Sequence, residues 1–160
     1  MIQLTKRTEY GLLALVRLAE REGEVVSARE IAEHYPIPKR LLAEVLKDLG
    51  HAQVVESHRG ANGGYSLARR ATSITVGEVV AALEGAPSLA SCEAMEIARN
   101  GSCDVEPNCP IKSPIQQLKA DLWALLERTT LSDLGRSQPA PSPETATSIH
   151  ERIAPRPHAG

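Results

Sequence analysis

Three cysteines, Cys92, Cys103 and Cys109, are the residues of this chain best suited to chemistry of their own. Ten residues separate the first pair and five separate the second. Iron–sulfur clusters are held by thiolates and tolerate wide loops between them. A structural zinc site more often shows a close Cys pair and four protein ligands. The spacing therefore favours an iron–sulfur cluster over zinc, and three unconnected thiols are the alternative.

Three thiolates leave one coordination position of a cluster open. An oxygen or nitrogen ligand, an external molecule or a residue from a partner chain can fill that position. A site with one weak ligand is open to attack by nitric oxide or oxygen and to loss of iron. The cysteine segment therefore suits a sensor.

The composition indicates a helical protein of the cytoplasm. The chain has 160 residues, with no Phe, one Trp and three Tyr, so its core must be built from Leu, Val, Ile and Ala. The scarcity of aromatic residues argues against a protein that stacks single-stranded bases. Neither an export signal nor an apolar run of membrane-spanning length is visible. A cytoplasmic protein rarely forms disulfides, which again favours metal or redox chemistry for the thiols.

The elements that must position such a site begin with a helix–turn–helix pattern. Apolar residues at helical spacing predict a helix over residues 8–22. A capping box that starts at Ser27 opens a short second helix, and residues 36–38, Pro-Ile-Pro, end it. A third helix covers residues 39–50. Two helices joined by such a turn are typical of DNA-binding proteins.

A β-hairpin follows the third helix. Val54 and Val55 are β-branched, residues 60–64 are rich in Gly and Asn, and residues 65–67 return as a second strand. A second capping box, from Thr75, opens a further helix that stops at Gly85. The predicted fold class is therefore mainly α with a small β-hairpin wing, a winged helix-turn-helix with a long dimerisation helix after it.

The winged region carries the basic residues expected to contact DNA. Residues 1–70 contain 11 Lys or Arg and 9 Asp or Glu, whereas residues 71–160 contain 7 and 11. The first residues of the second helix of such a motif face base edges in the major groove, and an Arg at a hairpin tip can enter a narrow minor groove. Solvated basic residues and an ordinary hairpin are the alternatives. The predicted DNA contacts are Lys39, Arg40, Arg59, Gly60, Gly63 and Gly64.

The second half of the chain divides into three further segments. Ser113 as the cap and Pro114 at the first helical position predict the start of a long helix. The isoleucine and leucines that follow step by three, four and three, which suits packing against a partner's helix or the chain's own core. The predicted organisation is a winged helix-turn-helix DNA-binding domain at 1–85, a cysteine-containing cluster loop at 86–112, a dimerisation helix and end of the fold at 113–135, and a disordered tail at 136–160.

Taken in order, these motifs resemble the Rrf2 family of bacterial repressors, which includes the iron–sulfur regulators IscR, NsrR and RirA. The resemblance runs from the N-terminus to about Leu134. It implies a transcriptional repressor, not an enzyme, that binds a roughly palindromic double-stranded DNA operator as a homodimer, with a cluster near the dimer interface. The motifs that carry it are Leu4-Thr5-Lys6-x-x-Glu9-Tyr10, Pro36-Ile37-Pro38, Arg59-Gly60-x-x-Gly63-Gly64-Tyr65, Ile74-x-Val76-Gly77-Glu78-Val79, Leu83-Glu84-Gly85, the three cysteines and Thr130-Leu131-Ser132-Asp133-Leu134.

The resemblance also implies a fourth cluster ligand. The IscR-like branch has a His three residues after its third Cys, where this chain has Lys112, and a protonated Lys is a poor ligand. The NsrR-like branch uses a carboxylate from the first helix of the other subunit, and Glu9 occupies that place here. An acid that merely stabilises a helix N-terminus is the alternative for Glu9. The implied ligand set is Cys92, Cys103, Cys109 and Glu9 of the partner subunit, with 4Fe-4S favoured over 2Fe-2S.

Two other classes of function are weighed against the regulator. One is a protein-interaction module that bears a metal or cluster and does not bind DNA. The other is an enzyme with a Cys nucleophile, which is disfavoured because no Cys has a His or Asn partner in a recognisable arrangement. The expected signals for a regulator are nitric oxide, redox state or iron.

Overall fold

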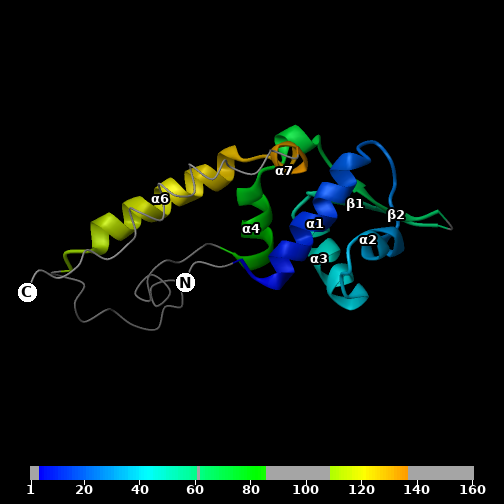
Figure 1. Ribbon diagram of the computed structural model, residues 1–160, viewed down its shortest axis with the longest axis horizontal. Helices are drawn as coiled ribbons and strands as arrows, with labels where there is room; N and C mark the ends of the chain where they lie inside the picture. Colours follow the sequence, from blue (N-terminus) through cyan, green and yellow to red (C-terminus); the bar gives the residue numbers. More distant parts are fainter. Residues whose placement is uncertain (1–3, 61, 86–108, 137–160) are drawn as a thin grey trace, which may run out of the picture.

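The computed structural model describes residues 4–60, 62–85 and 109–136 (Figure 1). The predictions for Cys92, Cys103 and the tail beyond residue 136 lie outside these residues. None of the described helices is long and apolar enough to cross a membrane. In chain order the elements are α1 (Lys6–Glu20), α2 (Ala28–His34), α3 (Lys39–His51), β1 (Val55–His58), β2 (Gly64–Leu67), the 3-10 turn η1 (Ala71–Ser73), α4 (Val76–Glu84), α6 (Lys112–Arg128) and α7 (Leu131–Gly135).

Helix α1 lies at the centre of the packed body, against α3, α4 and α7 (Figure 1). Thr5 caps its start, because the Thr5 hydroxyl accepts a hydrogen bond from the Thr8 backbone N–H at 3.3 Å. Gly11 allows the close approach of its neighbours, since a Cβ there would lie 2.6 Å from Leu83 Cδ1 and 3.3 Å from Val45 Cγ1. The core around α1 is aliphatic, as the composition predicted.

The predicted capping box of α2 forms only by half. Ser27 Oγ accepts from the Glu30 N–H at 3.1 Å, as expected. The Glu30 carboxylate instead binds two guanidinium groups of α1 and the turn that follows it, Arg17 at 3.1 Å and Arg21 at 3.3 Å. These ion pairs attach α2 to α1, so the first helix of the helix–turn–helix motif is held on the body.

The two strands form the predicted antiparallel hairpin, with Val55 opposite Leu67. The hairpin is attached to the body through Tyr65, whose backbone N–H and C=O both bond Val26, at 2.8 and 2.9 Å. Gly64 permits this approach, because a Cβ there would lie 2.3 Å from the Val26 carbonyl oxygen. The helix–turn–helix and hairpin together confirm the predicted fold class, mainly α with a small wing.

A short helix, α7, completes the core and was not predicted as an element. Thr130 and Asp133 form a reciprocal capping box at its start, and Leu131 is fully buried. Thr130 also forms a β-bridge with Thr75, the residue that caps α4 in the second predicted capping box. The signal for α7 was present in the sequence as a Thr and an Asp three residues apart.

Helix α6 extends away from the packed body, and its C-terminal end lies on α4 (Figure 1). At this contact a Cβ on Gly77 would lie 3.2 Å from the backbone nitrogen of Glu127. The prediction that Ser113 caps the helix was wrong, because α6 begins at Lys112 after Ile111, which makes no side-chain cap. The bond from the Lys112 N–H to the Cys109 carbonyl, at 3.4 Å, already turns the chain before Ser113.

Candidate nucleic-acid interface and metal site

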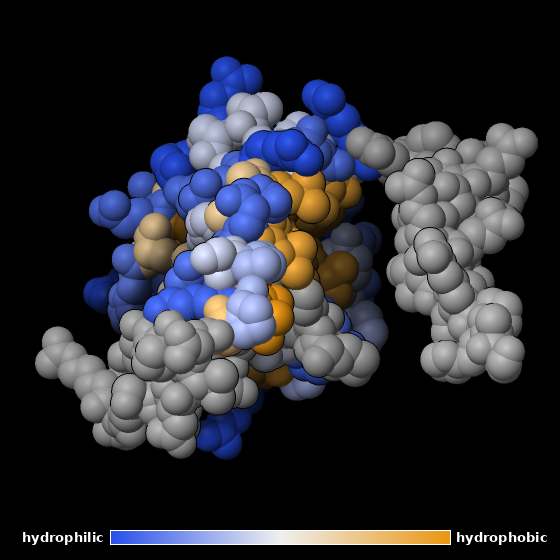
Figure 2. Space-filling view, turned by 90° about the vertical axis from the view of Figure 1, so that its left-hand side faces the viewer, coloured by the Kyte–Doolittle hydropathy of each residue, from blue (hydrophilic) through white to orange (hydrophobic). Residues whose placement is uncertain are grey.

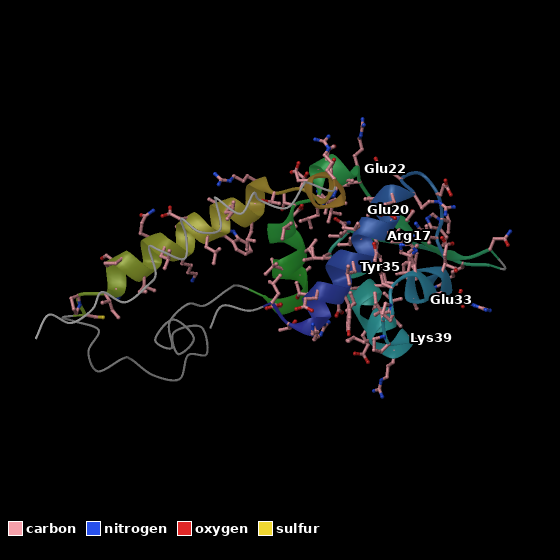
Figure 3. The ribbon with its side chains drawn as sticks, viewed as in Figure 1. Arg17, Glu20, Glu22, Glu33, Tyr35 and Lys39 are labelled. Carbon is pink, nitrogen blue, oxygen red and sulfur yellow. The ribbon has the colours of Figure 1, made fainter. Side chains whose placement is uncertain are left out.

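One face of α3 is exposed and carries basic side chains. Its opposite face is buried through Leu42, Val45, Leu46 and Leu49, so Lys39 and Arg40 are exposed at its start. Figure 3 shows Lys39 at the end of α3 that points away from α1. The Arg40 side chain is 95% exposed and its Nε donates to Glu44 at 3.3 Å. An exposed pair of this kind contributes little stability, so Arg40 can exchange Glu44 for a phosphate or a base edge.

The turn before α3 fixes the direction in which this basic end points. Ile37 follows the first proline of the turn and precedes the second, and its side chain is buried. Its N–H donates to the Tyr35 carbonyl at 2.6 Å. Pro38 stands at the N-cap of α3 and supplies no side-chain hydrogen bond. The first N–H groups of α3 therefore point toward the same side as Lys39 and Arg40, which adds the positive end of the helix dipole to their charges.

Arg59 lies at the hairpin tip. The three glycines predicted to contact DNA there differ in their surroundings. Arg59 and Gly60 are exposed; Gly60 has a φ of 121° and open space around the position of a Cβ. Gly63 is required by the turn itself, because a Cβ would lie 2.5 Å from the His58 carbonyl oxygen. Gly64 is required by the contact with Val26 described above. Of these three glycines, Gly60 is the one that combines exposure with a backbone conformation that favours glycine.

The predicted metal ligands that the structure describes are Cys109 and Glu9. Cys109 is a free, half-buried thiol just before α6. Glu9 lies in the first turn of α1, where its carboxylate pairs with Lys6. The described residues contain no group of three potential metal ligands. A thiolate and a carboxylate are both donors that iron accepts, so this part of the donor set fits an iron–sulfur site.

Within one chain these two ligands lie far apart. Cys109 comes directly before α6, so it stands at the end of α6 that is remote from α1 (Figure 1). A helix of 17 residues is about 25 Å long. A site that contained both Cys109 and Glu9 would therefore have to draw them from two chains.

A carboxylate that the sequence analysis did not single out connects α1 to α4. Glu84 Oε1 accepts from the Thr5 backbone N–H at 2.9 Å and from the Thr5 hydroxyl at 3.1 Å. Burial is the largest influence on the pKa of Glu84 and would raise it. The hydrogen bonds from Thr8 and Thr5 together outweigh burial and hold this pKa below its ordinary value. Glu84 thus fixes the start of α1, one turn before Glu9.

Comparison with known proteins shows which family and which solved structures the chain is similar to. Residues 4–137 match the Rrf2 family model, described as an iron-dependent transcriptional regulator. The chain is 34% identical over 138 residues to the HTH-type transcriptional regulator NsrR of Bacillus subtilis. The matched residues make up 86% of this chain and 92% of that protein. Among solved structures it is similar to CymR, the global cysteine regulator of B. subtilis, with a TM-score of 0.68, 27% identity and coverage of 87% and 100%. It is also similar to T. potens IscR, with a TM-score of 0.64, 25% identity and coverage of 97% and 93%.

The Glu84 contact predicts a pH dependence of stability. Because the folded pKa lies below the ordinary value of 4.5, the ionised carboxylate stabilises the fold above that pH. This contribution is lost as the pH falls through the folded pKa. Glu84→Gln should therefore lower the free energy of unfolding at neutral pH, and the difference from the wild type should shrink in acid. Denaturant unfolding of both proteins across this pH range measures it, and a difference that stays constant with pH would contradict the assignment.

Proposed function

Because the chain belongs to the Rrf2 family of transcriptional regulators, we propose that it is a homodimeric, cytoplasmic repressor that binds double-stranded DNA and senses its signal through a 4Fe-4S cluster. Its relatives are transcriptional regulators and not enzymes, in agreement with the sequence analysis. The observation that carries the proposal is the pair of exposed basic elements on one rigid body, the start of α3 and the hairpin tip.

The proposed reading of DNA uses both elements at once. The start of α3 enters the major groove, where Lys39 binds phosphate and Arg40 binds phosphate or the edge of a guanine. The hairpin places Arg59 in the neighbouring minor groove, where the negative potential is strongest over narrow A·T-rich sequence. The Tyr65–Val26 bonds hold the hairpin at a fixed position on the body that carries α3. Affinity then depends on how two such bodies are spaced.

A dimer through α6 is supported by the surface of that helix. None of its residues is buried, yet apolar side chains follow one another at intervals of four, three, four and three residues along it, which is the seam of a coiled coil. Figure 2, viewed from the end of the molecule at which α6 begins, shows hydrophobic side chains exposed on that face. An isolated helix of this length is marginal in water. The seam consists of Ile111 (62% exposed), Ile115, Leu118 (53%), Leu122 and Leu125 (44%).

The proposed cluster site is shared between two chains. Cys92, Cys103 and Cys109 of one subunit and Glu9 of the partner subunit would hold it, which agrees with the distance between Cys109 and Glu9 within one chain. When bound, the cluster would supply iron that can react with nitric oxide or oxidants and that is lost when iron is scarce. As a ligand, Glu9 would give up its ion pair with Lys6. Because α1 is packed on α3, the position of Glu9 and the position of the reading helix change together.

The wing provides the first test. Arg59→Gln should weaken binding to a duplex taken from the promoter of the chain's own gene by about tenfold, which corresponds to about 1.4 kcal/mol. The reason is the loss of one charged contact in the minor groove. Fluorescence anisotropy measures the affinity, and Arg70→Gln is the matched control, because Arg70 is 84% exposed and lies outside both reading elements. Equal effects of the two substitutions would contradict the role of the wing, and a wild-type protein that binds no duplex would favour the interaction module.

The α6 seam provides the second test. Leu118→Asp places a charge in the proposed helix–helix contact and should weaken dimerisation by about 100-fold. Gln116→Asp introduces the same charge away from the seam and should leave the dimer intact. Sedimentation equilibrium measures both, with circular dichroism to confirm that each variant is folded. A wild-type monomer, or a Leu118→Asp dimer as stable as the wild type, would contradict the proposed interface.

A further inference from the structure

A groove separate from Lys39, Arg40 and Arg59 lies between the last turns of α3 and the base of the hairpin. Its volume is about 510 Å³. The buried side chains of Leu46 and Val55 line its floor. Lys47 and His51 line it on the side of α3, and on the hairpin side it is lined by Glu56, Ser57 and Tyr65.

Both walls of this groove are held in place by backbone hydrogen bonds. Val54 follows the end of α3, and its N–H bonds the Leu49 carbonyl at 2.9 Å. Ser57 stands opposite Tyr65 in the hairpin, and Tyr65 is bonded to Val26 on its other side. The groove is therefore already formed in the free protein, so a ligand would bind it without a rearrangement of the backbone.

Four of the five polar side chains that line the groove can donate a hydrogen bond. Lys47 carries a positive charge, and the hydroxyl groups of Ser57 and Tyr65 and the imidazole of His51 can also donate. Of the carboxylates next to Lys47 on α3, Asp48 pairs with Arg7, and Glu44 pairs with Arg40 in the free protein. A ligand that only accepts hydrogen bonds and is negatively charged suits such a lining, and a phosphodiester has both properties. Glu56 is the one lining residue that repels it.

The position of the groove identifies the source of the phosphate. A duplex that admits the start of α3 to its major groove and Arg59 to the next minor groove has one sugar–phosphate strand between those two grooves. That strand would pass between α3 and the hairpin, and this groove lies between the last turns of α3 and the base of the hairpin. The exposed face of α3 continues from Lys39 and Arg40 to Lys47 without an interruption by packed side chains.

We propose that this groove seats the DNA strand that separates the major groove from the minor groove, with Lys47 bound to one of its phosphates. This inference rests on the proposed DNA binding and adds a third contact to the two reading elements. The Ser57 and Tyr65 hydroxyls and His51 complete the seat, and Glu56 reduces the affinity. The contact is to the backbone, so it positions the protein and does not distinguish one sequence from another.

The test uses the full-length protein and a labelled mixed-sequence DNA duplex, with affinity measured by anisotropy over a series of salt concentrations. Lys47→Gln should weaken binding several-fold and lower the slope of log affinity against log salt by about 1 for each subunit bound. Glu56→Gln should strengthen binding, because it removes the negative charge that faces the phosphate. Arg70→Gln removes a positive charge outside the groove and should leave the slope unchanged.

The outcomes separate this inference from the proposed function. Wild-type binding with a Lys47→Gln slope equal to that of the wild type would overturn the groove and leave DNA binding in place. Weaker binding by Glu56→Gln would also overturn it, since the sign of that effect follows from the position of Glu56. A wild-type protein that binds no duplex at low salt would contradict the proposed function itself.

Discussion

The packing of α1 against α3, α4 and α7 is the interaction on which the rest of this structure depends. Gly11 allows α1 to pack closely against Leu83 and Val45. Because close-packed interiors transmit displacement, we expect these helices to move together. The start of α1 carries Glu9, and Glu84 fixes that start through Thr5. Glu9, the proposed cluster ligand on α1, and the helix proposed to read DNA therefore belong to the same packed unit.

Helix α6 extends outside the packed body and contacts it at one end, on α4. Its C-terminal end is anchored where Gly77 meets Glu127, while no residue of the helix is buried among the described residues. A symmetric pair of such helices would bury the same seam of both chains. It would also bring the end of α6 that bears Cys109 toward a second α1. Dimerisation and completion of the cluster site are then consequences of one contact.

Local patterns in the sequence predicted most of the elements, and contacts distant in the sequence account for several of the features that these patterns missed. The capping box at Thr75 and the apolar faces of the helices depend on residues within two turns, and they are found where expected. The other half of the α2 capping box is absent because Glu30 is attracted to arginines of α1 and its following turn. Glu84 lies 79 residues from Thr5, which no periodicity relates to it. The groove beside Lys47 lies between α3 and the hairpin, and Gly64 allows the hairpin to approach the body.

If occupancy of a shared cluster controls DNA binding, loss of the cluster must change the affinity for DNA. Protein purified without oxygen is analysed for iron and acid-labile sulfide, and its affinity for the promoter duplex is measured before and after treatment with nitric oxide. We expect coloured protein with iron and sulfide in proportion to the chain, and a fall in affinity when the cluster is lost. Colourless, iron-free protein that binds the duplex equally well before and after treatment would contradict it.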